Sequence, residues 1–165
     1  MLDIIEYKNE FYPALQAEGY ALQWVMPFAK RILDGKVFGY DVGCNREEWA
    51  YPGAMPIDPN INPAHDALNL PLIQADYIIS SHCLEHLDDW RAALDHWYSR
   101  LKHGGVLFLY LPHPEQSYWA TGNPKHKHLL WPTKIALYLH QKGWIKVYAT
   151  DKDLNYSFTV VAEKP

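Results

Sequence analysis

The sequence predicts a three-layer α/β domain with seven strands, most of them parallel, in one sheet. Short apolar runs alternate with segments of helical periodicity along most of the chain, which is typical of helices that cover both faces of an open sheet. The apolar fraction, 48% of 165 residues, suffices for one hydrophobic core, and no internal repeat is visible. We therefore expect a single domain over residues 1–165 with a doubly wound, Rossmann-like sheet.

Residues 1–35 are expected to form a helical lead-in, and residues 36–165 the Rossmann-like core. The stretch 13–18 is typical of a short helix that ends at a glycine. A second helix is expected to run to Leu33, and Pro27 either starts or kinks it.

The expected strands are apolar runs bounded by turn residues. They cover residues 37–42, 54–57, 65–66, 76–80, 106–111, 144–150 and 156–162. The run 106–111 is apolar throughout, which predicts a central strand covered on both faces. Only residues 151–155 separate the last two strands, and this connection is too short for a crossover. These two strands are therefore expected to pair as an antiparallel hairpin at the edge of the sheet.

Caps and periodicity indicate two helices within the core. Apolar side chains recur at helical spacing over residues 90–101, after Asp88 or Asp89, either of which can cap the helix. The pair Gly104-Gly105 is expected to stop it. A further helix is expected over residues 132–142, with a glycine directly after it.

The composition excludes several classes of partner. The net charge is -4 and no long cluster of Lys or Arg is present, which argues against nucleic acid. No apolar run approaches the roughly 20 residues of a membrane helix, and residues 1–13 mix charged and apolar side chains, unlike a signal peptide. The only cysteines, Cys44 and Cys83, fit a reducing compartment. We expect a cytoplasmic protein without membrane or nucleic-acid partners, and homo-oligomerisation stays open.

Polar residues follow the ends of several expected strands, the edge at which doubly wound sheets bind ligands. Gly43, after the first strand, lets the backbone turn tightly and approach a ligand. Asp58, after the second strand, can accept hydrogen bonds from both hydroxyls of a ribose. Asp66 closes the third strand, and Ser81 follows the fourth. The pattern favours a nucleotide-type ligand at this edge.

Four motifs follow one another in a set order. They are Asp41-Val42-Gly43-Cys44-Asn45, then Asp58, then Asp66-Ala67-Leu68-Asn69-Leu70-Pro71, then Ser81-His82-Cys83-Leu84-Glu85-His86-Leu87. The set resembles the class I S-adenosylmethionine-dependent methyltransferases, most closely the small bacterial type, from about Val37 to the C-terminus. The expected terminal hairpin agrees. The resemblance implies S-adenosylmethionine as cofactor and, by analogy alone, a small-molecule or glycan-type methyl acceptor.

The resemblance also implies a role for each motif. The methionine end of the cofactor would be wrapped by the first motif, at Asp41, Gly43, Cys44 and Asn45. Asp58 would hold the ribose, and the adenine would face Asp66 and Ala67. Ser81 and His82 would lie beside the sulfonium, from which a side chain could touch the acceptor.

The glycine loop departs from the family pattern. Asn45 and Glu47 stand where the family usually has two further glycines, so either the loop takes another path or cofactor binding is weaker. Asn45 can partly stand in for glycine, because asparagine tolerates left-handed backbone angles. Only residues 43–54 join the first two strands, so the helix there is expected to be a stub over residues 46–50.

Three alternatives to an active methyltransferase stay open. A module that binds S-adenosylmethionine with weak or no turnover would explain the altered glycine loop. A nicotinamide-dependent oxidoreductase would use Asp58 in the same way, but the G-x-G-x-x-G pattern is missing and the terminal hairpin counts against it. A purely structural interaction domain would leave the acids after three successive strands without a purpose.

Methyl transfer needs alignment of the reacting atoms, and a base only where the nucleophile carries a proton. His82 and His113 are candidate catalytic bases, because both follow strand ends and histidine titrates near neutral pH. The alternative for His82 is packing or capping of the following turn. Glu85 and His86 are expected to form an intramolecular hydrogen bond that fixes the loop.

No metal site is expected. His126 and His128 alternate along an extended segment and could, with His113, offer nitrogens to zinc, but no cysteine or second spaced pair completes such a set. The irregular stretch 112–131, which contains these histidines, is expected to be either a lid over the acceptor entrance or plain surface covering.

Overall fold

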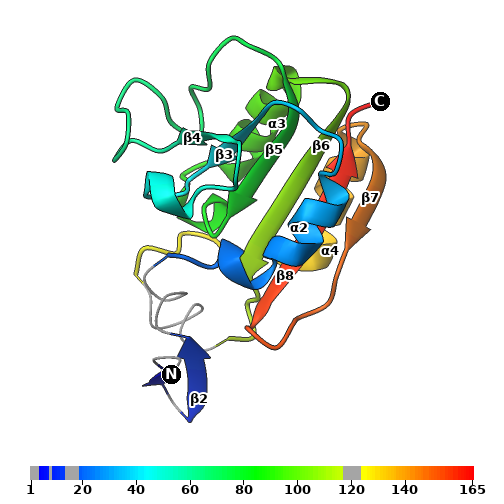
Figure 1. Cartoon of the computed structure of the whole chain (residues 1–165). Helices are drawn as coiled ribbons and strands as arrows, with labels where there is room; N and C mark the ends of the chain where they lie inside the picture. The colour runs from blue at the N-terminus through cyan, green and yellow to red at the C-terminus, as the bar shows by residue number, and fades with distance from the viewer. Residues whose placement is uncertain (1–3, 8, 14–18, 117–123) are drawn as a thin grey trace.

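A computed structural model describes residues 4–7, 9–13, 19–116 and 124–165 (Figure 1). Its centre is a six-stranded sheet in the order β4-β3-β5-β6-β8-β7. The strands are β3 (Gly39–Val42), β4 (Met55–Ile57), β5 (Ala75–Ser81), β6 (Leu101–Pro112), β7 (Ile145–Ala149) and β8 (Ser157–Glu163). The first four run parallel, and β8 is antiparallel to both of its neighbours. The predicted Rossmann-like sheet with an antiparallel edge hairpin is confirmed.

The prediction of seven strands is wrong, because the sheet has six within the described residues. The expected strand at residues 65–66 forms only an isolated bridge between Asp66 and Asn69. This segment closes on itself: the Leu68 N–H donates to Asp66 Oδ1 at 2.7 Å, and the Asn69 N–H donates to the Asp66 carbonyl at 3.1 Å. An aspartate turn of this kind satisfies the backbone locally, so no ladder with the sheet forms.

A separate hairpin replaces part of the expected helical lead-in. Strands β1 (Ile4–Tyr7) and β2 (Glu10–Pro13) pair antiparallel, with Asn9 in the turn at φ 63°. The isoleucine and aromatic residues of this stretch favour strands, and asparagine tolerates the left-handed turn. A helical lead-in is therefore wrong for residues 4–13, and most of the helix expected over 13–18 lies outside the described residues.

The second expected N-terminal helix is present in two pieces. A 3-10 turn, η1 (Leu22–Trp24), leads into α2 (Met26–Ile32), and Pro27 lies in the first turn of α2. Proline suits this place because the first helical N–H groups have no partner within the helix. Pro27 therefore starts the helix and does not kink it.

The remaining helical segments lie between the strands. They are the 3-10 turns η2 (Glu47–Trp49) and η3 (Leu84–His86), and the helices α3 (Trp90–Arg100) and α4 (Pro132–Gln141). The stub expected over residues 46–50 is confirmed by η2. Helix α3 ends at Arg100, and β6 starts directly at Leu101, earlier than expected, because Leu101 already pairs with Ala75 of β5. Within the described residues, none of the helices has both the length and the apolar character needed to cross a bilayer.

The sheet is buried on both faces. Alternate residues of β6 point to opposite sides: Leu107 and Leu109 belong to the core on the side of α3 and α4, whereas Phe108 and Tyr110 belong to the core that contains Ala29 of α2. Figure 1 shows α2 on one face of the sheet and α3 with α4 on the other. This is the expected three-layer arrangement, and it leaves the strand ends as the place for a ligand.

The two outer strands are irregular. The edge strand β4 has only three residues, and Pro56 is the middle one. At the opposite edge, the pairing of β7 with β8 shifts register between Ile145 and Tyr148, and Lys146 has φ 49°. Both edges thus lack a continuous row of regular backbone donors and acceptors.

Replacing Asp89 with alanine should lower the free energy of unfolding by about 1 kcal/mol. Asp89 is the N-cap of α3, and its Oδ1 accepts the N–H groups of Arg91 at 3.0 Å and Ala92 at 3.1 Å. Chemical denaturation measures the change. Asp89→Asn is the matched control and should stay close to wild type, because asparagine caps equally well. Equal stability of wild type and Asp89→Ala would show that the cap contributes nothing.

Candidate functional site

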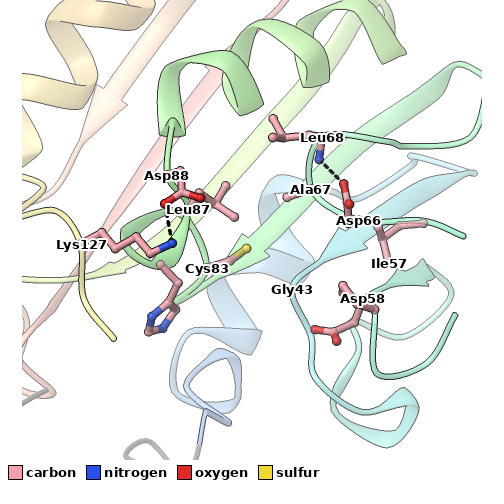
Figure 2. A pocket seen from close by; sticks show the side chains of 12 residues that line it. Gly43, Ile57, Asp58, Asp66, Ala67, Leu68, Cys83, Leu87, Asp88 and Lys127 are labelled. Atoms are coloured by element: carbon pink, nitrogen blue, oxygen red, sulfur yellow. Dashed lines mark hydrogen bonds and ion pairs between the residues drawn. The ribbon is translucent and has the colours of Figure 1, made fainter. Parts of the chain in front are cut away.

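Two adjoining cavities lie at the carboxyl ends of β3, β4 and β5. Cavity A has a volume of about 290 Å³ and cavity B of about 490 Å³. Both are bordered by Gly43, Asp58, Cys83, His86, Leu87 and Lys127. They are two parts of one depression, at the edge of the sheet where such folds bind ligands. Figure 2 shows the residues of cavity A.

The turn after β3 brings the backbone close to the cavities. Gly43 has φ 82°, and its N–H donates to the Ile57 carbonyl at 2.8 Å. A Cβ at this position would lie 2.5 Å from Cys83 Sγ, so only glycine fits without a shift of its neighbours. Asn45 follows with φ 65°, in the left-handed region that asparagine tolerates, and Glu47 is exposed. The loop therefore accommodates both departures from the glycine pattern.

Asp58 ties this turn to the end of β4. Its Oδ2 accepts the N–H of Asn45 at 2.9 Å and its Oδ1 the N–H of Asn60 at 2.9 Å, and the Asn60 side chain donates to Asn45 Oδ1 at 2.9 Å. The carboxylate borders both cavities and points into cavity A (Figure 2). A carboxylate has about four acceptor positions. Two of them stay available to a ligand after the loop contacts are made.

The turn after β4 supplies an apolar wall. Asp66 accepts the N–H of Leu68, and Asp66, Ala67 and Leu68 all border cavity A together with Ile57. The Ala67 carbonyl accepts the indole N–H of Trp97 from α3 at 2.7 Å, which holds the turn against the core. Cavity A therefore combines apolar walls with the Asp58 carboxylate.

Four of the residues predicted for the site border neither cavity. The Asp41 carboxylate is buried beneath the loop, where it accepts the Tyr51 N–H at 2.6 Å, and burial raises its pKa to about 7. Cys44 and Ser81 are also buried, and burial raises the pKa of Cys44 to about 12. His113 packs edge-on against Trp131 and Phe158. Of the predicted residues, the structure brings Gly43, Asn45, Asp58, Asp66, Ala67 and His82 together around the cavities.

His82 reaches cavity B in a strained backbone conformation. Its φ is 49°, and its N–H donates to the Tyr110 carbonyl at 2.8 Å. The ring Nε2 lies 3.0 Å from Ser157 Oγ. Burial holds the pKa of His82 well below its usual value, and the nearby His126 adds to the effect, so the ring is neutral at pH 7.

Glu85 lies at the centre of a cluster of imidazoles. Its side chain is buried, and Oε1 lies 3.6 Å from His86 Nε2 and 3.9 Å from both His126 Nε2 and His82 Nδ1. Burial raises the pKa of Glu85 to about 8, although its own backbone N–H opposes the shift. The expected hydrogen bond between Glu85 and His86 is wrong, because 3.6 Å is too long. Backbone hydrogen bonds hold the loop instead, from the His86 N–H to the Cys83 carbonyl at 3.0 Å and from the Leu87 N–H to the Leu84 carbonyl at 3.3 Å.

His113, His126 and His128, which the sequence analysis considered as a possible zinc set, do not lie together. His128 Nε2 contacts the Leu87 carbonyl at 2.9 Å, and His113 lies by Trp131 and Phe158. Only His126 of the three joins Glu85 and His86. Sequence spacing gave no signal for this set, because His126 is far from Glu85 along the chain.

Sequence reasoning also missed the basic rim of the cavities. Lys125 borders cavity B, Lys127 borders both, and Lys127 Nζ donates to Asp88 Oδ1 at 2.6 Å beside cavity A (Figure 2). Both lysines come from the irregular stretch 112–131. Its described C-terminal part therefore forms a wall of the cavities, and residues 117–123 lie outside the described residues.

Solved structures share this fold. A structure from Thermotoga maritima, described as an S-adenosylmethionine-dependent methyltransferase and possible histamine N-methyltransferase, is 15% identical with a TM-score of 0.73, covering 92% of this chain and 96% of that one. An S-adenosylmethionine-dependent methyltransferase from Archaeoglobus fulgidus is 18% identical with a TM-score of 0.67, covering 93% and 100%. The N-methyltransferase NodS of Bradyrhizobium japonicum, in complex with S-adenosylhomocysteine, is 16% identical with a TM-score of 0.65, covering 89% and 88%.

A comparison with curated protein sequences gives no match. The family model described as a methyltransferase domain matches residues 10–153, most of the chain and all of β3 to β6. This match favours methyl transfer over the nicotinamide-dependent alternative. The chain belongs to the methyltransferase-domain family, whose methyl donor is S-adenosylmethionine.

Proposed function

We propose that this chain transfers the methyl group of S-adenosylmethionine to a small-molecule acceptor, with the cofactor lying along cavities A and B. The observation that carries the proposal is the Asp58 carboxylate, which borders both cavities beside the left-handed turn at Gly43 and Asn45. A nucleoside with an extended charged tail fits such a site. The carboxylate can accept hydrogen bonds from the ribose hydroxyls, and the turn at Gly43 has no side chain that would keep the tail away from the backbone.

The adenosine end is assigned to cavity A. The two acceptor positions that remain on Asp58 would take the two ribose hydroxyls. The adenine would lie between apolar side chains, with Ile57 and Leu68 on one side and Leu87 on the other. Asp66 would act by shaping the turn that presents Ala67 and Leu68, since its Oδ1 accepts the Leu68 N–H.

The methionine end is assigned to the junction of the two cavities, at Gly43 and Asn45. The Asp41 carboxylate beneath this turn and the buried side chain of Cys44 within it would support the turn without touching the cofactor. His82 would lie near the sulfonium, since it borders cavity B at the end of β5. Ser81 is buried beside it and borders neither cavity.

The reaction requires the acceptor to enter cavity B. Bound S-adenosylmethionine would supply the methyl group: a lone pair of the acceptor's nucleophilic atom would form the new bond to the methyl carbon, and the electrons of the carbon–sulfur bond would pass to sulfur to give S-adenosylhomocysteine. The chain contributes alignment and the exclusion of water. His82 is neutral and borders cavity B, so it is the candidate to accept a proton from the acceptor, although the burial that lowers its pKa also weakens it as a base. His113 borders neither cavity and has no place in this step.

The size of cavity B favours a small acceptor. Its volume of about 490 Å³ lies in the range of small-molecule sites, and the methionine end of the cofactor would occupy part of it. A glycan-type acceptor is the second candidate. The net charge of -4 gives no support to a nucleic-acid acceptor.

Isothermal titration with S-adenosylhomocysteine tests the cofactor site, and release of S-adenosylhomocysteine from S-adenosylmethionine tests turnover. We expect one cofactor per chain with micromolar affinity, and turnover with at least one member of a panel of small amines, phenols, carboxylic acids and sugars. No binding at millimolar cofactor would contradict the proposal. Binding without turnover across the whole panel would favour a binding module that has lost activity.

A further inference from the structure

The Glu85 carboxyl group is buried without a compensating cation. Its relative exposure is 0%, and neither oxygen accepts a hydrogen bond from another residue that the structure describes. Among those residues, its ion-pair contacts are all to imidazoles. A buried carboxylate is costly unless it is paired or coordinates a metal. At neutral pH the buried Glu85 carboxyl group therefore either keeps its proton or binds a cation.

The distances around Glu85 suit a shared ion better than hydrogen bonds. Oε1 lies 3.6 Å from His86 Nε2 and 3.9 Å from His126 Nε2, whereas an N–H···O bond spans roughly 2.7–3.2 Å. Two ligand atoms bound at about 2.0–2.1 Å to a tetrahedral zinc ion lie about 3.4 Å apart. One ligand atom from each of Glu85, His86 and His126 lies within 4.8 Å of the others. A small inward movement would close this set around one ion.

The hydrogen bond of His86 fixes which of its nitrogens can act as a ligand. Nδ1 lies 3.1 Å from the Lys125 carbonyl, which can only accept, so Nδ1 carries the proton. The neutral ring then presents the Nε2 lone pair to Glu85 Oε1. Two electron pairs that face each other repel unless a proton or a metal ion lies between them. Metal-binding histidines are typically oriented by a carbonyl in this way.

The backbone holds the two parts of the cluster together. The Glu85 carbonyl accepts the N–H groups of Lys127 at 2.8 Å and His128 at 3.3 Å. These bonds fix the segment that carries His126 against η3, which carries Glu85 and His86. The His86 and His126 rings lie with centroids 4.7 Å apart and planes at 75°. The side chains are thus positioned in advance by main-chain contacts.

We propose that Glu85, His86 and His126 bind one divalent transition-metal ion of the zinc type, with an open coordination position toward cavity B. Two imidazoles and one carboxylate form a ligand set that zinc uses at sites that keep a place for substrate. His86 borders both cavities, and its neighbours His82 and Lys125 border cavity B. We place the open position on the side of cavity B because His86 is the one of the three ligands that borders it.

The proposed metal site would select one class of methyl acceptor; this step rests on the proposed function. An acceptor with a hydroxyl group bound to the ion would lose its proton to water more readily, because a bound cation lowers the pKa of its oxygen ligand. The oxygen lone pair would then form the bond to the methyl carbon, and the electrons of the carbon–sulfur bond would pass to sulfur to give S-adenosylhomocysteine. Acceptors with a hydroxyl or phenol group are thus favoured over aliphatic amines.

Zinc titration of the full chain tests the site directly. The protein is freed of metal by a chelator and titrated with zinc chloride by calorimetry, and with cobalt(II) by visible absorption. We expect one ion per chain and the absorption bands of tetrahedral cobalt. His86→Ala and His126→Ala should each weaken zinc binding at least ten-fold. His140→Ala, which removes an exposed imidazole from α4, is the matched control and should bind like wild type.

Circular dichroism and thermal unfolding separate loss of the metal site from loss of the fold. The His86 side chain is 36% exposed, so its removal should leave the fold intact, as circular dichroism can verify. Zinc should raise the thermal unfolding midpoint of wild type and leave that of Glu85→Gln unchanged. The inference is overturned if wild type shows no stoichiometric binding at millimolar zinc, or if both histidine variants bind as wild type does.

Cofactor binding is measured in the same samples. If wild type binds S-adenosylhomocysteine but no zinc, the metal site is refuted and the proposed function is not. Intact zinc binding without any S-adenosylhomocysteine binding would refute the proposed function and leave the metal site standing.

Discussion

Replacing Asp58 with alanine should weaken S-adenosylhomocysteine binding about 100-fold. Hydrogen bonds to a charged group contribute about 1.5–3 kcal/mol each. At the lower end of this range, loss of two such bonds to the ribose costs about 3 kcal/mol in total, which corresponds to roughly a factor of 100 in the dissociation constant. The variant also frees the N–H groups of Asn45 and Asn60. Isothermal titration measures the effect.

The control for this prediction separates the ribose contact from the support of the loop. Wild type should bind adenosine more tightly than 2′,3′-dideoxyadenosine, and Asp58→Ala should bind the two alike. If the variant kept the preference, Asp58 would act only through the loop. Asp34→Ala removes an exposed carboxylate that precedes β3, and it should leave the affinity unchanged.

Replacing Gly43 with alanine should lower the free energy of unfolding by about 2–5 kcal/mol. A side chain at φ 82° costs roughly 1–2 kcal/mol. The added Cβ would also meet Cys83 Sγ at 2.5 Å and Cys83 Cβ at 2.6 Å. Overpacking of this kind typically costs about 1–3 kcal/mol. Chemical denaturation gives the total.

Gly53→Ala is the matched control for Gly43→Ala. Gly53 has a similar φ of 84°, but a Cβ there would meet nothing within 4 Å. Its replacement should therefore cost only the backbone strain, about 1–2 kcal/mol. Equal losses in the two variants would show that contact with Cys83 adds nothing, and that the turn can move away from β5.

Local signals explain which elements could be predicted from the sequence. The Asp89 cap and the periodicity of residues 90–101 indicate α3, and the apolar run after Gly105 indicates the central part of β6. The hairpin at residues 4–13 was missed because its strands have only four residues each, too few for their periodicity to exclude a helix, although isoleucine and aromatic residues favour strands. Pairing with Ala75 extends β6 back to Leu101, and such pairing is invisible in local sequence.

The site could be predicted where chemistry follows directly from a strand end. Gly43 and Asp58 come directly after β3 and β4, so their place at the cavities follows from topology. The role of Asp41 did not follow, because its side chain turns under the loop to the Tyr51 N–H. His126 depends on a long connection that folds back onto η3, and no spacing rule encodes that contact.

The outer strands of the sheet have a consequence for self-association. Pro56 of β4 has no N–H that could donate a hydrogen bond to a strand of another molecule. In β7, the positive φ of Lys146 interrupts the regular backbone. A foreign strand would find no uninterrupted template on either side. Concentrated solutions of this chain should resist fibrillar stacking through the six-stranded sheet, and a homodimer would have to form without extending that sheet.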